Sequence, residues 1–106
     1  MDFNFEQYKG FYITSSSYNF IEHLLVLELL ESPEKNVDSL QLTISEVYDF
    51  KEDIYHDFEA ESLGNMEAIK IDNDAQQIHL NTGDAIIQFK FTSNSTVEVS
   101  SSVHPK

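Results

Sequence analysis

The sequence contains no cysteine and no tryptophan, and it has only three glycines and two prolines among its 106 residues. Without cysteine the chain can form neither a disulfide framework nor a thiolate zinc site, and it has no cysteine nucleophile. We therefore expect it to fold in a reducing compartment, the cytoplasm, around a hydrophobic core. The glycines stand far apart, so neighbouring residues cannot assemble a glycine-rich cradle for phosphate.

Arginine is also missing, and six lysines stand against 19 aspartates and glutamates, which gives a formal net charge of −13. Arginine is the side chain best suited to bidentate contacts with phosphate or guanine. Binding to a nucleic acid or to an anionic membrane requires a positive surface, which this composition does not supply. A strongly negative field instead favours rapid association with a basic partner, besides keeping a protein soluble.

Composition and length together indicate one globular domain that covers residues 1–106. Hydrophobic residues make up 41% of the chain and aromatic residues 12%, enough to build a core. The first residues lack the positive charge that begins an export signal, so we expect no export. The leucine-rich run at residues 24–30 is interrupted by Glu28 and is far shorter than the roughly 20 residues of a membrane-spanning helix.

The last third of the chain consists of short runs rich in isoleucine, valine, phenylalanine and threonine, separated by turn-forming residues. Apolar and polar residues alternate within the runs, which predicts strands with one dry face and one wet face. Glycine and asparagine in the turns suit the positive φ angles of tight hairpins. We expect an antiparallel meander with strands at residues 68–72, 76–81, 85–92 and 96–100.

Two further strands are predicted in the first half of the chain. Residues 40–45 alternate, with Leu40, Leu42 and Ile44 on one side. The apolar residues that follow continue in a shifted phase, which indicates either a bulge or the end of the strand. Gly10 and residues 11–14 indicate a turn that leads into a short strand.

The stretch at residues 18–31 has two interpretations. Its length, its leucine content, the serines at 15–17 as N-caps and Ser32-Pro33 as a stop favour a helix. Its acidic residues do not gather on one helical face, so a buried strand over residues 23–30 is the alternative. A separate helical turn is expected in the acidic segment further along the chain, where Ile54 and Phe58 stand four residues apart and would both face the core. The predicted fold is therefore α+β, an antiparallel meander of about five to six strands with one or two short helices packed on one face.

The most acidic part of the chain is residues 46–61, where seven carboxylates and one lysine give a net charge of −6. Tyrosine and phenylalanine alternate with these acids, so the segment would combine aromatic anchors with charges that steer association. The alternative is an amphipathic element whose rings face the core and whose acids face water. As the partner-binding set we select Asp49, Glu52, Asp53, Tyr55, Asp57 and Glu59.

No motif for catalysis or metal binding is present in the sequence. The serines lack a Gly-x-Ser-x-Gly elbow, and the histidines lack His-Glu-x-x-His spacing. Asp53, His56 and Asp57 make a partial metal site at best, which we interpret as a solvated acidic face. Residues 72–74 open like a calcium loop without its glycine and closing glutamate, and we interpret them as a hairpin turn. We expect no catalytic residue, no metal and no cofactor.

The stretches LTISEVYDF at residues 42–50 and IHLNTGD at residues 78–84 stand in an acidic chain of about 100 residues that lacks cysteine. With these two stretches, its length, its acidity and its lack of cysteine, the chain resembles the immunity proteins of bacterial polymorphic toxin and contact-dependent inhibition systems. The resemblance implies a cytoplasmic bacterial protein that binds a cognate toxin tightly, often a basic nuclease, and blocks its active site or a neighbouring surface. It assigns no functional residues to this chain.

The expected function is therefore that of a non-enzymatic inhibitor, which neutralises a basic toxin through an acidic aromatic patch. Two alternatives remain open. One is a small β-rich enzyme or ligand-binding domain with a pocket beside the sheet. The other is an accessory domain whose exposed strand edge pairs with a second copy.

Overall fold

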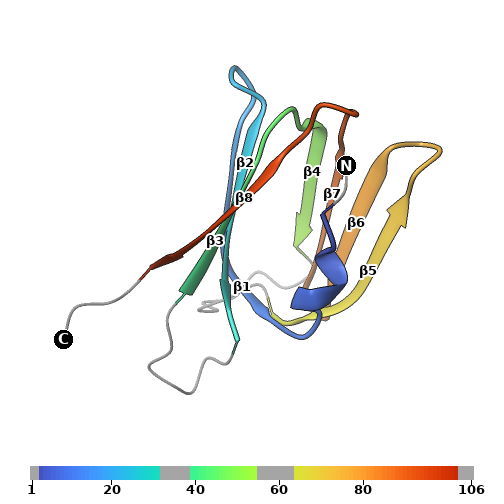
Figure 1. Cartoon of the computed structure of the whole chain (residues 1–106). Helices are drawn as coiled ribbons and strands as arrows, with labels where there is room; N and C mark the ends of the chain where they lie inside the picture. Colours follow the sequence, from blue (N-terminus) through green and yellow to red (C-terminus); the bar gives the residue numbers. More distant parts are fainter. Residues whose placement is uncertain (1–2, 32–38, 55–63, 103–106) are drawn as a thin grey trace.

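The computed structural model of the chain describes residues 3–31, 39–54 and 64–102, and these residues form mainly β-strands (Figure 1). The strands make two four-stranded antiparallel sheets with the orders β1-β2-β3-β8 and β4-β7-β6-β5. A short 3-10 helix, η1, precedes them and lies beside β5. The elements are η1 (Phe5–Tyr8), β1 (Tyr12–Asn19), β2 (Leu24–Leu30), β3 (Ser39–Ile44), β4 (Tyr48–Ile54), β5 (Met66–Asp72), β6 (Gln77–Thr82), β7 (Ala85–Lys90) and β8 (Val97–Ser102).

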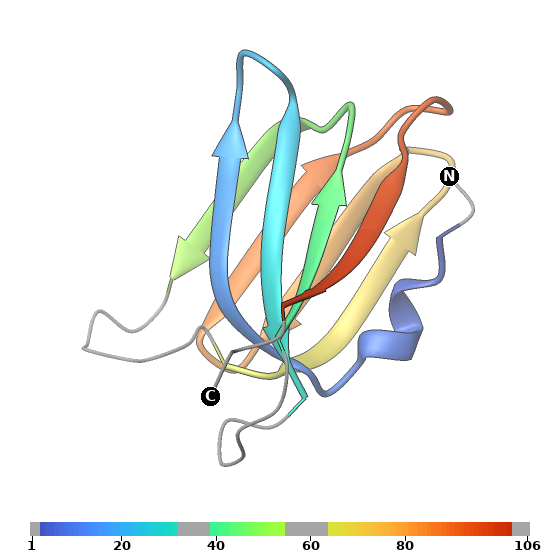
Figure 2. The same ribbon diagram turned by 60° about the vertical axis from the view of Figure 1, so that its left-hand side comes forward.

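The two sheets lie face to face and share one hydrophobic core (Figure 2). On the first sheet Leu25, Leu27 and Leu29 of β2 are fully buried, while the residues between them are half-buried. Burying an apolar side chain of this size stabilises a fold by about 1.5–3 kcal/mol. The period of two thus places one row of β2 in the core. The second sheet contributes Ile78, Leu80, Ile87 and Phe89.

The predicted α+β architecture is wrong, because the described residues contain no α-helix and only the 3-10 turn η1. Residues 18–31, for which a helix was preferred, form the end of β1, a turn and β2, so the alternative of a strand is confirmed. The serines expected as helix caps lie within β1. Leucine favours helices, but β2 pairs with a strand on each side, and sheet packing overrides that propensity. Ile54 ends β4 rather than starting a helical turn, and Phe58 lies outside the described residues.

The four strands predicted in the last third are confirmed as β5 to β8, but only β5, β6 and β7 form a meander. Strand β8 leaves them and pairs with β3 in the other sheet. The hairpin turn at residues 72–74 is confirmed, since Asp72 Oδ1 accepts hydrogen bonds from the backbone N–H groups of Asp74 and Ala75, both at 3.0 Å. In this hairpin the residue with a positive φ is Gln76, at 52°. In the next hairpin Gly83 does not have a positive φ. Glycine and asparagine therefore do not supply these angles here.

Both strands predicted in the first half are confirmed. The strand after Gly10 extends as far as Asn19, and residues 39–44 form β3 with Leu42 and Ile44 buried. The shifted phase after Ile44 has two causes. The strand ends there, and a register shift in β4 follows between Tyr48 and Lys51.

The chain crosses between the sheets twice at the same place, from β3 to β4 and from β7 to β8. The two connections are hydrogen-bonded to each other. The Ser45 backbone N–H donates to the Thr96 carbonyl oxygen at 2.9 Å, and Ser95 Oγ donates to the Glu46 carbonyl oxygen at 3.0 Å. Thr92 Oγ1 donates to the Glu46 carboxylate at 2.8 Å. These bonds satisfy polar groups where the chain leaves each sheet, and they hold the two sheets together at this end.

Candidate functional site

Strand β4 carries the described half of the predicted partner-binding set, Asp49, Glu52 and Asp53. Tyr55, Asp57 and Glu59 lie outside the described residues. The strand is at the edge of its sheet, with β7 as its neighbour, and six of its seven residues are exposed. Phe50 packs against the core, and the other residues of this acid-rich edge strand are exposed.

The three described carboxylates point in different directions. Asp49 stands at the irregular part of β4 with φ 52°, and its carboxylate lies 3.7 Å from the ammonium of Lys90. The Glu52 carboxylate accepts a hydrogen bond from the hydroxyl of Ser16 on β1. Asp53 is the next residue and so projects from the opposite face of the strand. The structure thus brings these residues to one strand but not to one face.

Tyr18 adds a second contact between β1 and β4, besides the hydrogen bond from Ser16 to Glu52. The ring of Tyr18 stacks on Phe50, with centroids 5.0 Å apart, and its hydroxyl donates to the carbonyl oxygen of Val47 at 2.5 Å. Burial raises the pKa of the Tyr18 hydroxyl above its ordinary value, and Tyr48 and Asp49 raise it further. Tyr18 is therefore a neutral hydrogen-bond donor at neutral pH, and it fixes β4 against the other sheet.

The β1–β2 and β3–β4 connections meet at one end of the two-sheet structure (Figures 1 and 2). The Val47 backbone N–H donates to the His23 carbonyl oxygen at 2.9 Å, and the rings of His23 and Tyr48 lie 4.3 Å apart. His23, Glu46 and Asp49 have φ angles of 56°, 51° and 52°, a conformation uncommon outside glycine. Such angles persist where surrounding contacts determine the backbone, so this end of the molecule is closely specified.

The β1–β2 turn presents two large apolar side chains to solvent. Phe20 is 73% exposed and Ile21 is 76% exposed, more than any other large hydrophobic residue in the described ranges. Asn19 Oδ1 accepts hydrogen bonds from the backbone N–H groups of Ile21 at 2.9 Å and Glu22 at 3.1 Å, which holds the turn in shape. Phe20 and Ile21 were not expected to be exposed, because the sequence pattern favours a helix over residues 18–31. Asn19, between two strand-like runs, is the signal that indicates a turn.

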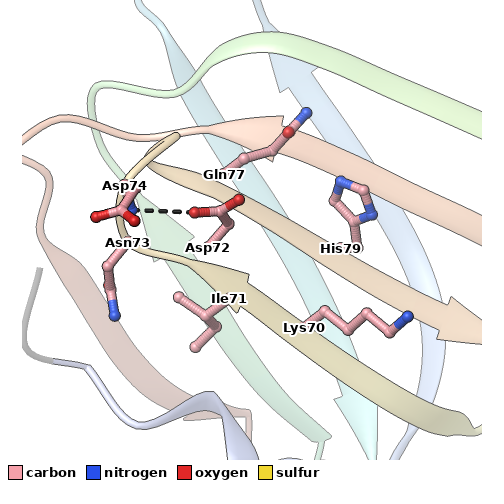
Figure 3. A pocket seen from close by; sticks show the side chains of 7 residues that line it. All are labelled: Lys70, Ile71, Asp72, Asn73, Asp74, Gln77 and His79. Atoms are coloured by element: carbon pink, nitrogen blue, oxygen red, sulfur yellow. Dashed lines mark hydrogen bonds between the residues drawn. The ribbon is translucent and has the colours of Figure 1, made fainter.

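An open depression lies on the β5–β6 hairpin, where Lys70 and His79 stand opposite each other in register (Figure 3). It carries charges of both signs, and most of its lining residues are exposed. It was not predicted, because the pairing of the two strands is what brings its residues together. The lining residues are Lys70, Ile71, Asp72, Asn73, Asp74, Gln77 and His79.

The described part of the chain contains no group of three histidine, aspartate or glutamate side chains that could hold a metal ion. No helix found there has the length and apolar character needed to cross a membrane. Comparisons of the chain with protein-family models, with curated proteins and with solved structures found no match. The features on which a function can be based are therefore the acid-rich strand β4, the apolar turn and the open depression.

Proposed function

We propose that this protein is a non-enzymatic binding protein that neutralises a basic protein partner, as immunity proteins do with toxins. The observation that carries the proposal is the exposure of strand β4, six of whose seven residues face solvent at the edge of a sheet. Asp49, Glu52 and Asp53 lie within a stretch of five residues on this strand, and Asp53 is on the opposite face from Glu52.

The negative charge would act first on the rate of association. A net charge of −13 attracts a basic surface and speeds the encounter with it. This attraction weakens as salt shortens the Debye length from about 10 Å at 0.1 M to about 3 Å at 1 M. Binding to the partner should therefore be fast at low salt and slower at high salt.

The three carboxylates are not equivalent in this proposal. Asp49 already pairs with Lys90 and Glu52 with Ser16, so a partner would have to exchange those contacts for its own. Asp53 projects from the exposed strand on the other face, away from Ser16. We expect Asp53 to contribute most to steering.

The charges on β4 also favour a foreign partner over a second copy. An edge strand with exposed acidic and lysine side chains resists pairing with its own copy, because like charges would face each other. The depression of Figure 3 is open, whereas a small-molecule site usually buries most of its ligand. An exposed charged strand is better suited to a protein surface than to a small ligand.

The test is capture of partners from an extract of the source cells on the immobilised full chain. The Asp49→Lys/Asp53→Lys variant is compared with Glu67→Lys/Asp74→Lys, which changes the net charge equally on β5 and its turn. We expect wild type and the Glu67/Asp74 variant to retain a basic protein that high salt releases, and the Asp49/Asp53 variant to lose it. Equal capture by both variants, or capture of an acidic protein alone, contradicts the proposal.

A further inference from the structure

We infer that the turn between β1 and β2, residues 19–23, is an anchor that enters an apolar pocket with a basic rim on the partner protein. We call these residues the hairpin tip. The inference rests on the proposed function, since it names the part of the chain that enters the basic partner. Its apolar residues, Phe20 and Ile21, lie outside strand β4.

The first support is the exposure and shape of the hairpin tip. Phe20 and Ile21 are adjacent, 73% and 76% exposed, and lie on a hairpin that projects past the neighbouring connections in both views (Figures 1 and 2). Large apolar side chains that fill a pocket supply most of the energy of many protein interfaces. A projecting pair of this kind fits a concave site rather than a flat surface.

The second support is that the hairpin tip is already ordered. Asn19 Oδ1 accepts hydrogen bonds from the backbone N–H groups of Ile21 and Glu22. At the end of the turn His23 is fixed by the Val47 N–H donating to its carbonyl oxygen and by the contact of its ring with Tyr48. A turn held at both ends loses little conformational freedom when it binds, which favours affinity.

The third support is charge, which identifies the chemistry of the partner. Glu22 is exposed within the hairpin tip, and the exposed Asp49 follows Tyr48, whose ring contacts His23. Asp49 is paired with Lys90, so the charge next to the apolar pair is that of Glu22. Glu22 and the net charge of −13 match a basic rim and repel an anionic lipid surface. A second copy of the chain carries the same charge of −13, which opposes association of two copies through the tip.

The chemistry can be tested with amino-substituted β-cyclodextrin, which has an apolar cavity and an amine rim, against neutral β-cyclodextrin as the matched host. Both are titrated into the full chain while the backbone amide resonances are followed. We expect the cationic host to perturb residues 19–23 first and to bind at least tenfold more tightly than the neutral host. Phe20→Ser/Ile21→Ser should abolish this binding, whereas Val99→Ser, at a residue 44% exposed on β8, should preserve it. Equal affinities, or shifts centred elsewhere, would overturn the inference.

The same variants are then used in the capture experiment. Because both tip side chains already face solvent, Phe20→Ser/Ile21→Ser should unfold at the wild-type temperature yet lose the basic partner at least tenfold. Undiminished capture would overturn the inference and leave the proposed function standing. Uptake by phosphatidylcholine vesicles that depends on Phe20 would also overturn it, in favour of a lipid contact. If wild type captures no basic protein, the proposed function fails, whereas the host titration still decides the chemistry of the tip.

Discussion

The ring of Tyr18 in β1 lies on the ring of Phe50 in β4, with the two planes inclined by 21°. The contact joins the edge strands of two different sheets. The hydroxyl of the same tyrosine reaches the carbonyl oxygen of Val47, just before β4 begins. The side chain of Tyr18 thus joins the acid-rich strand, which pairs with β7 in its own sheet, to the edge of the other sheet.

Removing the two parts of this contact separately should lower stability by different amounts. Tyr18→Phe keeps the ring and loses the hydrogen bond, so we expect the free energy of unfolding to fall by about 1 kcal/mol. Tyr18→Ala also loses the ring packing and should cost about 3 kcal/mol. Urea denaturation measures both values. Equal losses from the two substitutions would show that the ring contact contributes nothing.

The raised pKa of Tyr18 predicts a loss of stability in alkali. Burial favours the neutral phenol in the folded state, so the folded pKa lies above the unfolded value of 10.0. Above that pH the unfolded chain releases the proton first, and the free energy of unfolding falls as pH rises through the folded pKa. Tyr18→Phe has no such group at this position. Wild type should therefore lose stability more steeply than Tyr18→Phe above pH 10, and parallel pH profiles would contradict the prediction.

The hydrogen bond from Thr92 to Glu46 joins the two crossovers and should be measurable in a double-mutant cycle. With Glu46→Ala and Thr92→Val, each of which removes one partner of the hydrogen bond, we expect a coupling of about 1 kcal/mol, because the bond is partly buried and one partner is charged. Asp49 and Lys90 serve as the control pair, since their side chains are 66% and 48% exposed. Their coupling should be about 0–1 kcal/mol and should vanish in high salt. A Glu46–Thr92 coupling as small and as salt-sensitive as the control would refute the assignment.

Gln76 offers a stabilising substitution. Its φ of 52° lies in the left-handed region, which costs a residue with a β-carbon about 1–2 kcal/mol and costs glycine little. Gln76 is exposed, so Gln76→Gly should raise the free energy of unfolding by about 1 kcal/mol. Asn73→Gly in the same turn, where φ is not positive, should give no gain. Thermal or urea unfolding of the two variants decides the matter.

Asn19 should be important for the shape of the hairpin tip. Asn19→Ala removes the acceptor for two backbone N–H groups and should lower the free energy of unfolding by about 1 kcal/mol. Asn19→Asp retains an acceptor at the same place and should restore most of the loss. Amide hydrogen exchange at Ile21 and Glu22 should accelerate in Asn19→Ala alone. Unchanged exchange there would mean that the turn does not depend on this side chain.

The strands of the last third were predictable because their apolar residues alternate and polar turns separate them. The strand with which β8 pairs could not be predicted from the sequence. Its pairing with β3 depends on contacts between residues far apart in the sequence, such as Ser45 and Thr96. The strand at residues 24–30 was ambiguous for a related reason. Its leucines lie on both faces of a strand between two others, so the run lacks the alternation that marks a half-exposed strand.

The candidate site shows the same division. The positions of the carboxylates on β4 follow from the sequence, but their directions depend on the register shift near Asp49 and on Ser16 from another sheet. Phe20 and Ile21 belonged to a predicted helix, and only the formation of the β1–β2 hairpin exposes them.

The sequence by itself determined the excess of negative charge, the lack of thiol chemistry and most of the strands, because composition and alternation are local properties of the chain. Tertiary structure alone decided how the strands divide between two sheets, which acids lie free of other contacts and which apolar residues meet solvent. Those outcomes depend on hydrogen bonds and packing between segments distant in the chain, and no local pattern records which distant segment will supply the partner.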